Sequence, residues 1–138
     1  MAAKIRKVNY VYIKAPNRAG QATRVLTALR DAKVNLLAFS GFPERRGTAQ
    51  IDLVTDDLSG LKGVARREGW KLSSTRRAFL VQGTDEVGAA LAALAKVAAK
   101  KINVIAADAV SAGTGRFGMI FWVSPRHYAR AAKALGAR

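Results

Sequence analysis

The chain has 138 residues, half of them hydrophobic, and its 24 basic and 9 acidic side chains give a formal net charge of +15. This length allows one domain or two small ones, and the hydrophobic fraction excludes a disordered chain. Cysteine is absent and His127 is the single histidine, which excludes a disulfide framework and a thiolate or histidine-based metal site.

No apolar run approaches the roughly 20 residues that cross a bilayer. The basic N-terminus leads into an alternating segment, unlike the apolar stretch of a signal peptide. We therefore expect a cytoplasmic protein with no membrane partner. The positive charges are scattered, with no run of more than two basic residues. They are compatible with a solvated basic surface and with nucleic-acid binding, and composition leaves both open.

The first elements in chain order are a strand, a turn and a helix. Residues 8–14 alternate in polarity and are rich in β-branched and aromatic side chains, which predicts a strand. The turn Pro16–Gly20 follows it. Apolar residues then recur at helical spacing, at Ala22, Val25, Leu26 and Leu29.

Three further elements complete the first half. Residues 35–42 and 48–55 are predicted strands joined by a turn at 45–47. A short helix at 58–65 and a fourth strand at 70–75 follow. The order β-α-β-β-α-β is the ferredoxin-like split motif.

The second half repeats these elements. Asn103 follows Asn35 by 68 positions, and Gly88 follows Gly20 by the same 68 positions. A constant offset over five elements indicates an internal repeat. We predict two units, 1–75 and 76–138. The sequence stops where a fourth strand of the second unit would begin, so we expect that unit to lack it.

No catalytic constellation is predicted. His127 has no cysteine or serine nucleophile motif beside it, and two acidic pairs, Asp56-Asp57 and Asp85-Glu86, fall at predicted helix starts, where they compensate the helix dipole. We expect a protein that is not an enzyme, with no cofactor and no metal site.

The two strand-to-helix turns, 15–20 and 83–88, offer the chemistry best suited to a ligand. A helix N-terminus presents unpaired N–H groups to a carboxylate, and a glycine there permits close approach. Asn17 or Asp85 adds an oxygen for an ammonium group, so an amino acid would satisfy both ends. Both residues are also common as ordinary caps or turn residues, and spacing does not separate these roles.

A strand, then Asp-x-x-Gly, a helix, and Val/Ile-Asn opening the next strand resembles the ACT domain. The second copy carries this pattern in Phe79–Val81, Asp85–Gly88 and Ile102–Val104. The first copy has Asn17 where aspartate is usual and Ala19 where proline is common. The resemblance covers nearly the whole chain. It implies an α+β fold of two ferredoxin-like βαββαβ units side by side, with antiparallel sheets and helices on one face.

ACT domains are typically regulatory modules that bind amino acids where two of them pair. The resemblance thus implies a free-standing sensor whose ligand lies between the first turn of one copy and the second strand of its neighbour. The implied ligand-binding positions are Asn17, Ala19, Gly20, Gln21, Asn35, Leu36, Asp85, Val87, Gly88, Ala89, Asn103 and Val104. Asn35 and Asn103 are equally suited to end a helix in a left-handed cap, and both roles can hold together.

One face of each predicted sheet should be covered by helices, and it includes Phe39 and Ile105. The other face is too apolar for a wetted surface; it holds Tyr10, Tyr12, Leu36, Val54, Leu80, Val104, Ile120 and Trp122. Large exposed apolar patches mark interfaces, so we expect a homodimer packed through this open face. The alternative is a basic nucleic-acid-binding protein that stacks bases on the open-face aromatic rings. Asp52 on that face favours the homodimer.

Two expectations concern strand edges. The second strands, 36–42 and 104–110, should join edge to edge, because they lack the lysines and prolines that protect an edge. The missing fourth strand would leave 77–82 unpaired. We expect a second subunit to cover this edge, in preference to residues 3–7 or 71–75.

Overall fold

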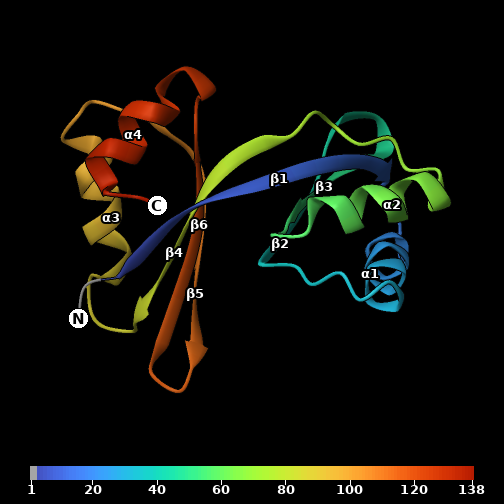
Figure 1. Cartoon of the computed structure of the whole chain (residues 1–138), viewed down its shortest axis with the longest axis horizontal. Coiled ribbons are helices and arrows are strands. Elements are labelled where there is room, and N and C mark those ends of the chain that lie inside the picture. The colour runs from blue at the N-terminus through green and yellow to red at the C-terminus, as the bar shows by residue number, and fades with distance from the viewer. Residues whose placement is uncertain (1–2) are drawn as a thin grey trace. The chain divides into compact units, whose positions relative to one another are not determined.

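The computed structural model describes residues 3–138 as an α+β protein (Figure 1). Its helices and strands are β1 (Lys4–Pro16), α1 (Gln21–Asp31), β2 (Ala38–Pro43), β3 (Thr48–Val54), α2 (Leu58–Glu68), β4 (Arg76–Thr84), α3 (Ala89–Ala98), β5 (Val104–Gly113), β6 (Arg116–Val123) and α4 (Tyr128–Leu135), with short 3₁₀ turns at Arg45–Gly47 and Pro125–His127. This element order confirms the predicted strand and helix succession of both copies, apart from the fourth strand of the first. No helix within residues 3–138 is long and apolar enough to span a membrane.

The described residues form two compact units. The first unit is Asn9–Arg76, and the second consists of Arg77–Arg138 together with the described residues up to Val8. Strand β1 is therefore divided between them. The boundaries expected from the sequence, 1–75 and 76–138, give these N-terminal residues to the first unit.

The strands pair in the order β2-β3-β1-β4-β6-β5. The internal repeat is visible in the antiparallel register of each unit. Val11 lies opposite Leu53 in the first unit, and Phe79 lies opposite Phe121 in the second. Phe79 follows Val11, and Phe121 follows Leu53, by the 68 positions of the sequence repeat. The two copies therefore share one strand register.

Each unit builds its core from alternate strand residues and one stripe of its own two helices. In the first unit, Val11, Ile13 and Leu53 of the sheet pack with Val25 and Leu29, which lie four residues apart on α1. The second unit has a corresponding core: its sheet and helix residues include Phe79, Val81, Met119, Phe121, Val97 and Ala131. Helices therefore cover one face of each sheet, as predicted.

Two residues expected beneath the helices are exposed instead. Phe39 on β2 is 40% exposed and Ile105 on β5 is 61% exposed. Both strands form the outer edge of their units, where β2 pairs with β3 and β5 pairs with β6. The pairing of β5 also shifts register between Val104 and Ala106, which interrupts the regular alternation around Ile105.

The open face differs from the expectation. Val54, Leu80, Ile120 and Trp122 are each at most 7% exposed. Tyr10 and Tyr12 are half-buried. The prediction that this face offers a large exposed patch to a homodimer partner is wrong, because its apolar side chains are already covered within the chain.

The edge of β4 is covered by the N-terminal part of β1. These two strands are neighbours in the sheet, and the Cβ of Ala3 lies 3.0 Å from the position that a Cβ would occupy at Gly83. On the other side of β1, the Arg138 N–H donates to the Ile5 carbonyl at 3.3 Å, and the Lys7 N–H donates to the Arg138 carbonyl at 2.9 Å. The expectation of a second subunit at this edge is wrong, because the chain supplies its own strand.

The first unit has no regular strand at 70–75, contrary to expectation. Ser73 nevertheless lies against β1: its N–H donates to the Tyr12 carbonyl and its hydroxyl oxygen accepts the Tyr12 N–H, both at 2.9 Å. The hydroxyl thus takes the place of a main-chain acceptor.

The predicted joining of the second strands within the chain is also wrong. β2 and β5 stand at the two ends of the strand order, because β1 and β4 make the connecting pair instead. Each therefore keeps one edge without a strand partner in the described chain.

Candidate functional site

The turn into α3 leaves a helix N-terminus open. Gly88 occupies the N-cap position in the left-handed region, with φ 82°, and no side chain caps the helix. A Cβ at Gly88 would meet no heavy atom within 4 Å. The Ala89 N–H donates to the Glu86 carbonyl at 3.0 Å, so the N–H groups of Ala90 and Leu91 are the ones accessible to a ligand acceptor.

Asp85 joins this turn to the β5–β6 hairpin. Its N–H donates to the Gly115 carbonyl at 2.9 Å, and its carboxylate Oδ2 accepts the Ser111 hydroxyl at 2.5 Å. Nothing else within residues 3–138 bonds to this carboxylate. A negative charge thus stands in a fixed position at the mouth of the turn.

Exposed apolar side chains belong to the segments that this bond connects. Val87 in the turn is fully exposed, and Leu91 one helical turn later is 67% exposed. Val110 is 64% exposed as well, but it points to the opposite face of β5 from its neighbour Ser111. Open N–H groups, one carboxylate and apolar side chains make this end of the second unit suited to a small zwitterion with an apolar group. We call the turn 84–89 with Ser111 the β4–α3 site.

The first unit repeats this geometry without the charge. The Asn17 N–H donates to the Gly47 carbonyl at 2.7 Å, and Gly20 has φ 90° with open space above it and no side-chain cap on α1. Each of these groups precedes its counterpart by the repeat offset. Asn17 replaces the carboxylate, however, and Pro43 replaces the Ser111 hydroxyl.

Helix α2, unlike α1 and α3, has a side-chain cap at its N-terminus. There the Asp57 carboxylate accepts the Gly60 N–H at 2.9 Å and caps the helix from within. The turns into α1 and α3 lack such a bond, so Asn17 and Asp85 are not caps, and the alternative of an ordinary turn residue stays open for both.

The other predicted positions lie away from these turns. Asn103 and Val104 stand at the start of β5, whereas the Asp85 carboxylate meets Ser111 near its end. A strand of this length spans roughly 25–30 Å, so the two groups do not meet within the unit. In the first unit, Asn35 and Leu36 likewise precede β2, and the Asn35 carbonyl accepts the Thr55 hydroxyl at 2.8 Å.

The left-handed helix ends fall at other residues than expected. Lys33 and Lys101 have φ 60° and 59°, and they follow α1 and α3. The alternative that Asn35 and Asn103 are left-handed caps is therefore wrong, since each lies two residues beyond the left-handed position.

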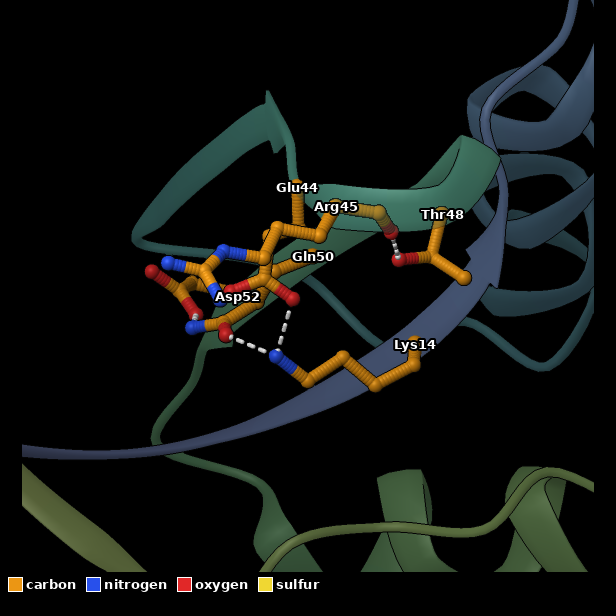
Figure 2. A network of polar contacts seen from close by, with 6 residues as sticks. All are labelled: Lys14, Glu44, Arg45, Thr48, Gln50 and Asp52. Carbon is orange, nitrogen blue, oxygen red and sulfur yellow. Dashed lines mark hydrogen bonds and ion pairs between the residues drawn. The ribbon is translucent and has the colours of Figure 1, made fainter.

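A polar network crosses the open face of the first unit (Figure 2). The Lys14 ammonium donates to the Glu44 carboxylate. It also donates to the side-chain amide oxygen of Gln50, Oε1, at 2.6 Å. The Gln50 amide then donates to Asp52 at 2.9 Å. Asp52 is only 5% exposed, and burial raises the pKa of its carboxyl despite the Gln50 bond.

This network argues against base stacking on the open face. Lys14 and Arg76 lie over the Tyr12 ring, at 5.0 and 5.8 Å from its centroid, and Trp122 is buried. Rings that cations or neighbours already cover are poorly placed to stack on nucleotides. Within residues 3–138 there is also no group of three histidine, cysteine or acidic side chains that would hold a metal.

Comparison with known proteins finds the fold in solved structures. A Bacteroides thetaiotaomicron protein matches with a TM-score of 0.75 at 15% identity, covering 97% of this chain and 88% of that one. The ligand-free regulatory subunit of aspartate kinase from Thermus thermophilus matches with a TM-score of 0.63 at 15% identity, and the match covers 99% of this chain and 95% of that subunit. The regulatory subunit of aspartate kinase from Thermus flavus matches with a TM-score of 0.60 at 16% identity, and the match again covers 99% of this chain and 95% of that subunit.

No protein-family model and no curated protein sequence matches the chain. The structural likeness nevertheless confirms the predicted α+β fold of the ACT type, as seen in these regulatory subunits.

Proposed function

We propose that this protein is a non-enzymatic regulatory sensor that binds an amino acid at the β4–α3 site. The observation that carries the proposal is the uncapped N-terminus of α3 beside the Asp85 carboxylate. The likeness to regulatory subunits of aspartate kinase supports a regulatory role.

The site offers one group for each part of an amino acid. The α-carboxylate would accept N–H groups of the first turn of α3, aided by the helix dipole. The ammonium group would pair with Asp85, which Ser111 already orients. Val87 and Leu91 would lie along an apolar side chain.

The two copies should differ in affinity. Asn17 is neutral, so the turn of Asn17, Ala19, Gly20 and Gln21 would hold an ammonium group less strongly than the second copy does. We therefore assign the tighter site to Asp85, Val87, Gly88 and Ala89. Asn35, Leu36, Asn103 and Val104 would take part only if a neighbouring molecule brings the start of β2 or β5 to a turn.

A homodimer would provide that neighbour. Nine of the ten residues of β5 are exposed, and its unpaired edge carries no lysine or proline. We propose that two copies pair through this edge and complete their ligand sites there, in the cytoplasm.

The test is a thermal-shift screen against the common amino acids, followed by calorimetry on any that stabilise the protein. A ligand at about 100 times its Kd adds about 2.7 kcal/mol of stability if it binds only the native state. Asp85→Asn, which copies the first unit, should weaken binding at least tenfold. Glu68→Gln removes an exposed acidic charge at the end of α2 in the first unit, outside the site, and should leave affinity unchanged. A screen with no stabilising amino acid, or equal losses from both variants, would defeat the proposal.

A further inference from the structure

The second unit contains a pocket of about 510 Å³ on a side that the proposed amino-acid site does not use. Four of its lining side chains are basic, and they come from three places in the unit: Lys7 on β1, Arg77 on β4, Lys133 on α4 and Arg138 after it. No lining residue is acidic.

The backbone holds these segments together. Gly136 ends α4 in the left-handed region, with φ 65°, and turns the chain back toward β1. The main chain of Arg138 then bonds to Ile5 and Lys7. The four basic residues thus converge through regular pairing and a helix end, although they are far apart in the sequence.

One of the four is fixed in orientation. The Arg77 guanidinium carbon lies 4.2 Å from the centroid of the Tyr128 ring. That ring stacks on Phe79 with centroids 4.4 Å apart, and its hydroxyl donates to the Ala78 carbonyl at 2.8 Å. A planar guanidinium held in this way loses little freedom when it binds an anion.

The charges in the pocket have no acidic partner. None of the four basic side chains makes an ion pair with an acidic side chain of residues 3–138, unlike Lys14 and Arg30, which pair with Glu44 and Asp31. A carboxylate at residue 138, in a chain that ends there, still leaves a positive excess. Converging cations repel one another, so a multiply charged anion would be bound favourably.

We infer that this pocket is a binding site for a small molecule that carries two or more phosphate groups. Arginine forks and lysine ammonium groups together match phosphate oxygens. The volume lies within the range of small-ligand pockets, and alanine and glycine at its α4 side leave space for a ligand. A concave site of this size favours a compact ligand over a nucleic-acid strand, whose phosphates need an extended track.

Pyrophosphate is the direct probe, measured by calorimetry on the whole chain at low and at physiological ionic strength. We expect one pyrophosphate per chain, tighter binding than for inorganic phosphate, and an affinity that falls as salt rises. ADP and ATP test whether the phosphates belong to a nucleotide.

The variant Lys133→Gln removes one lining charge from an exposed position of α4 and should weaken pyrophosphate binding at least tenfold. Lys96→Gln on α3 removes the same charge outside the pocket and should change affinity less than twofold. Arg77→Lys keeps the charge but loses the planar fork, and it should weaken binding several-fold.

Three results would overturn the inference: no pyrophosphate binding, equal losses from Lys133→Gln and Lys96→Gln, or binding of a short oligonucleotide but not of pyrophosphate. None of these variants lies in the β4–α3 site, so each should bind amino acids as the wild type does. Failure of the pyrophosphate site can therefore be distinguished from failure of the amino-acid site.

Discussion

Asp52 is a carboxylate in an unusual position for its charge. Asp52 is 5% exposed, and its carboxylate accepts a hydrogen bond from the Gln50 side-chain amide. Burial raises its pKa because the charged form loses hydration that this bond restores only in part. The residue therefore costs stability whenever it is ionised in the folded protein.

We expect Asp52→Asn to stabilise the protein by about 1 kcal/mol at neutral pH, since a neutral amide can still accept the Gln50 bond. The folded pKa lies above the unfolded value of about 3.9, so the wild type loses stability as pH rises through that window. The gain from Asp52→Asn should thus shrink as pH falls below the raised pKa and disappear below the unfolded pKa of about 3.9. Denaturant unfolding from acid to neutral pH measures this. Asp108→Asn, an exposed carboxylate on β5, is the control, and an equal gain there would contradict the explanation.

Tyr128 makes a different buried bond. Its hydroxyl donates to the Ala78 carbonyl, and burial raises its pKa to about 12. Tyr128→Phe keeps the ring against Phe79 and Arg77 but leaves that carbonyl without its donor. We expect a loss of about 1–3 kcal/mol in the free energy of unfolding. Tyr12→Phe removes a hydroxyl that bonds to nothing in residues 3–138 and should cost much less.

At the scale of elements, the turns that begin α1 and α3 depend on glycine. A side chain at φ 82° is strained whatever space surrounds it, so a bulky replacement at Gly88, such as valine, would reduce binding through backbone strain as well as through contact with the ligand. A smaller change with a matched control separates the two effects.

Gly88→Ala should lower both stability, by about 1 kcal/mol, and amino-acid affinity, at least tenfold, because the new methyl group stands where the ligand approaches. Gly69→Ala has the same left-handed backbone, with φ 75°, and equally open space, but it ends α2 away from the site. It should lose similar stability and no affinity. Matching affinity losses in the two variants would remove Gly88 from the site.

The divided strand β1 gives a second prediction at this scale. Ile5 packs against the core of the second unit, whereas Lys4 beside it is exposed. Ile5→Asn should destabilise the second unit by about 1–3 kcal/mol and speed amide exchange in β4 and β6. Lys4→Asn should do neither. Faster exchange throughout β3 of the first unit would show that the effect is not confined to the second.

The sequence predicts most elements because its apolar spacing is regular. Alternation in 8–14 and helical spacing from Ala22 to Leu29 identify β1 and α1, and the repeat transfers both to the second copy. Spacing does not identify a strand's partner, which explains why the sequence favoured a second subunit over residues 3–7 as the partner of β4. The same limit hid the bond between Asp85 and Ser111, for which the sequence offers no signal beyond a hydroxyl near the hairpin.

At the scale of the whole molecule, two opposing effects govern self-association: the unpaired edge of β5 favours it, and the net positive charge of each chain opposes it. The β5 edge favours pairing with another copy, but two chains with a net charge of +15 repel each other. Added salt screens that repulsion and should shift the equilibrium toward the dimer.

Ala109→Lys places a charge in the middle of the β5 edge strand and should abolish dimer formation at every ionic strength. Sedimentation velocity of the wild type and the variant over a salt series measures this. Lys62→Ala, an exposed change on α2, serves as a control and should leave salt-dependent association intact. A wild type that stays monomeric in high salt would contradict the proposed dimer.

The divided strand also sets an order of events during synthesis. The first unit is continuous from Asn9 to Arg76, so all of it is made before residues 77–138 of the second unit. The second unit needs residues 3–8, which are made before the first unit, and β4 to α4, which are made after it. The N-terminal part of β1 therefore has no β4 beside it until the first unit has been made. The N-terminal strand must wait unpaired through that interval, and chaperones that bind extended apolar segments would find it there.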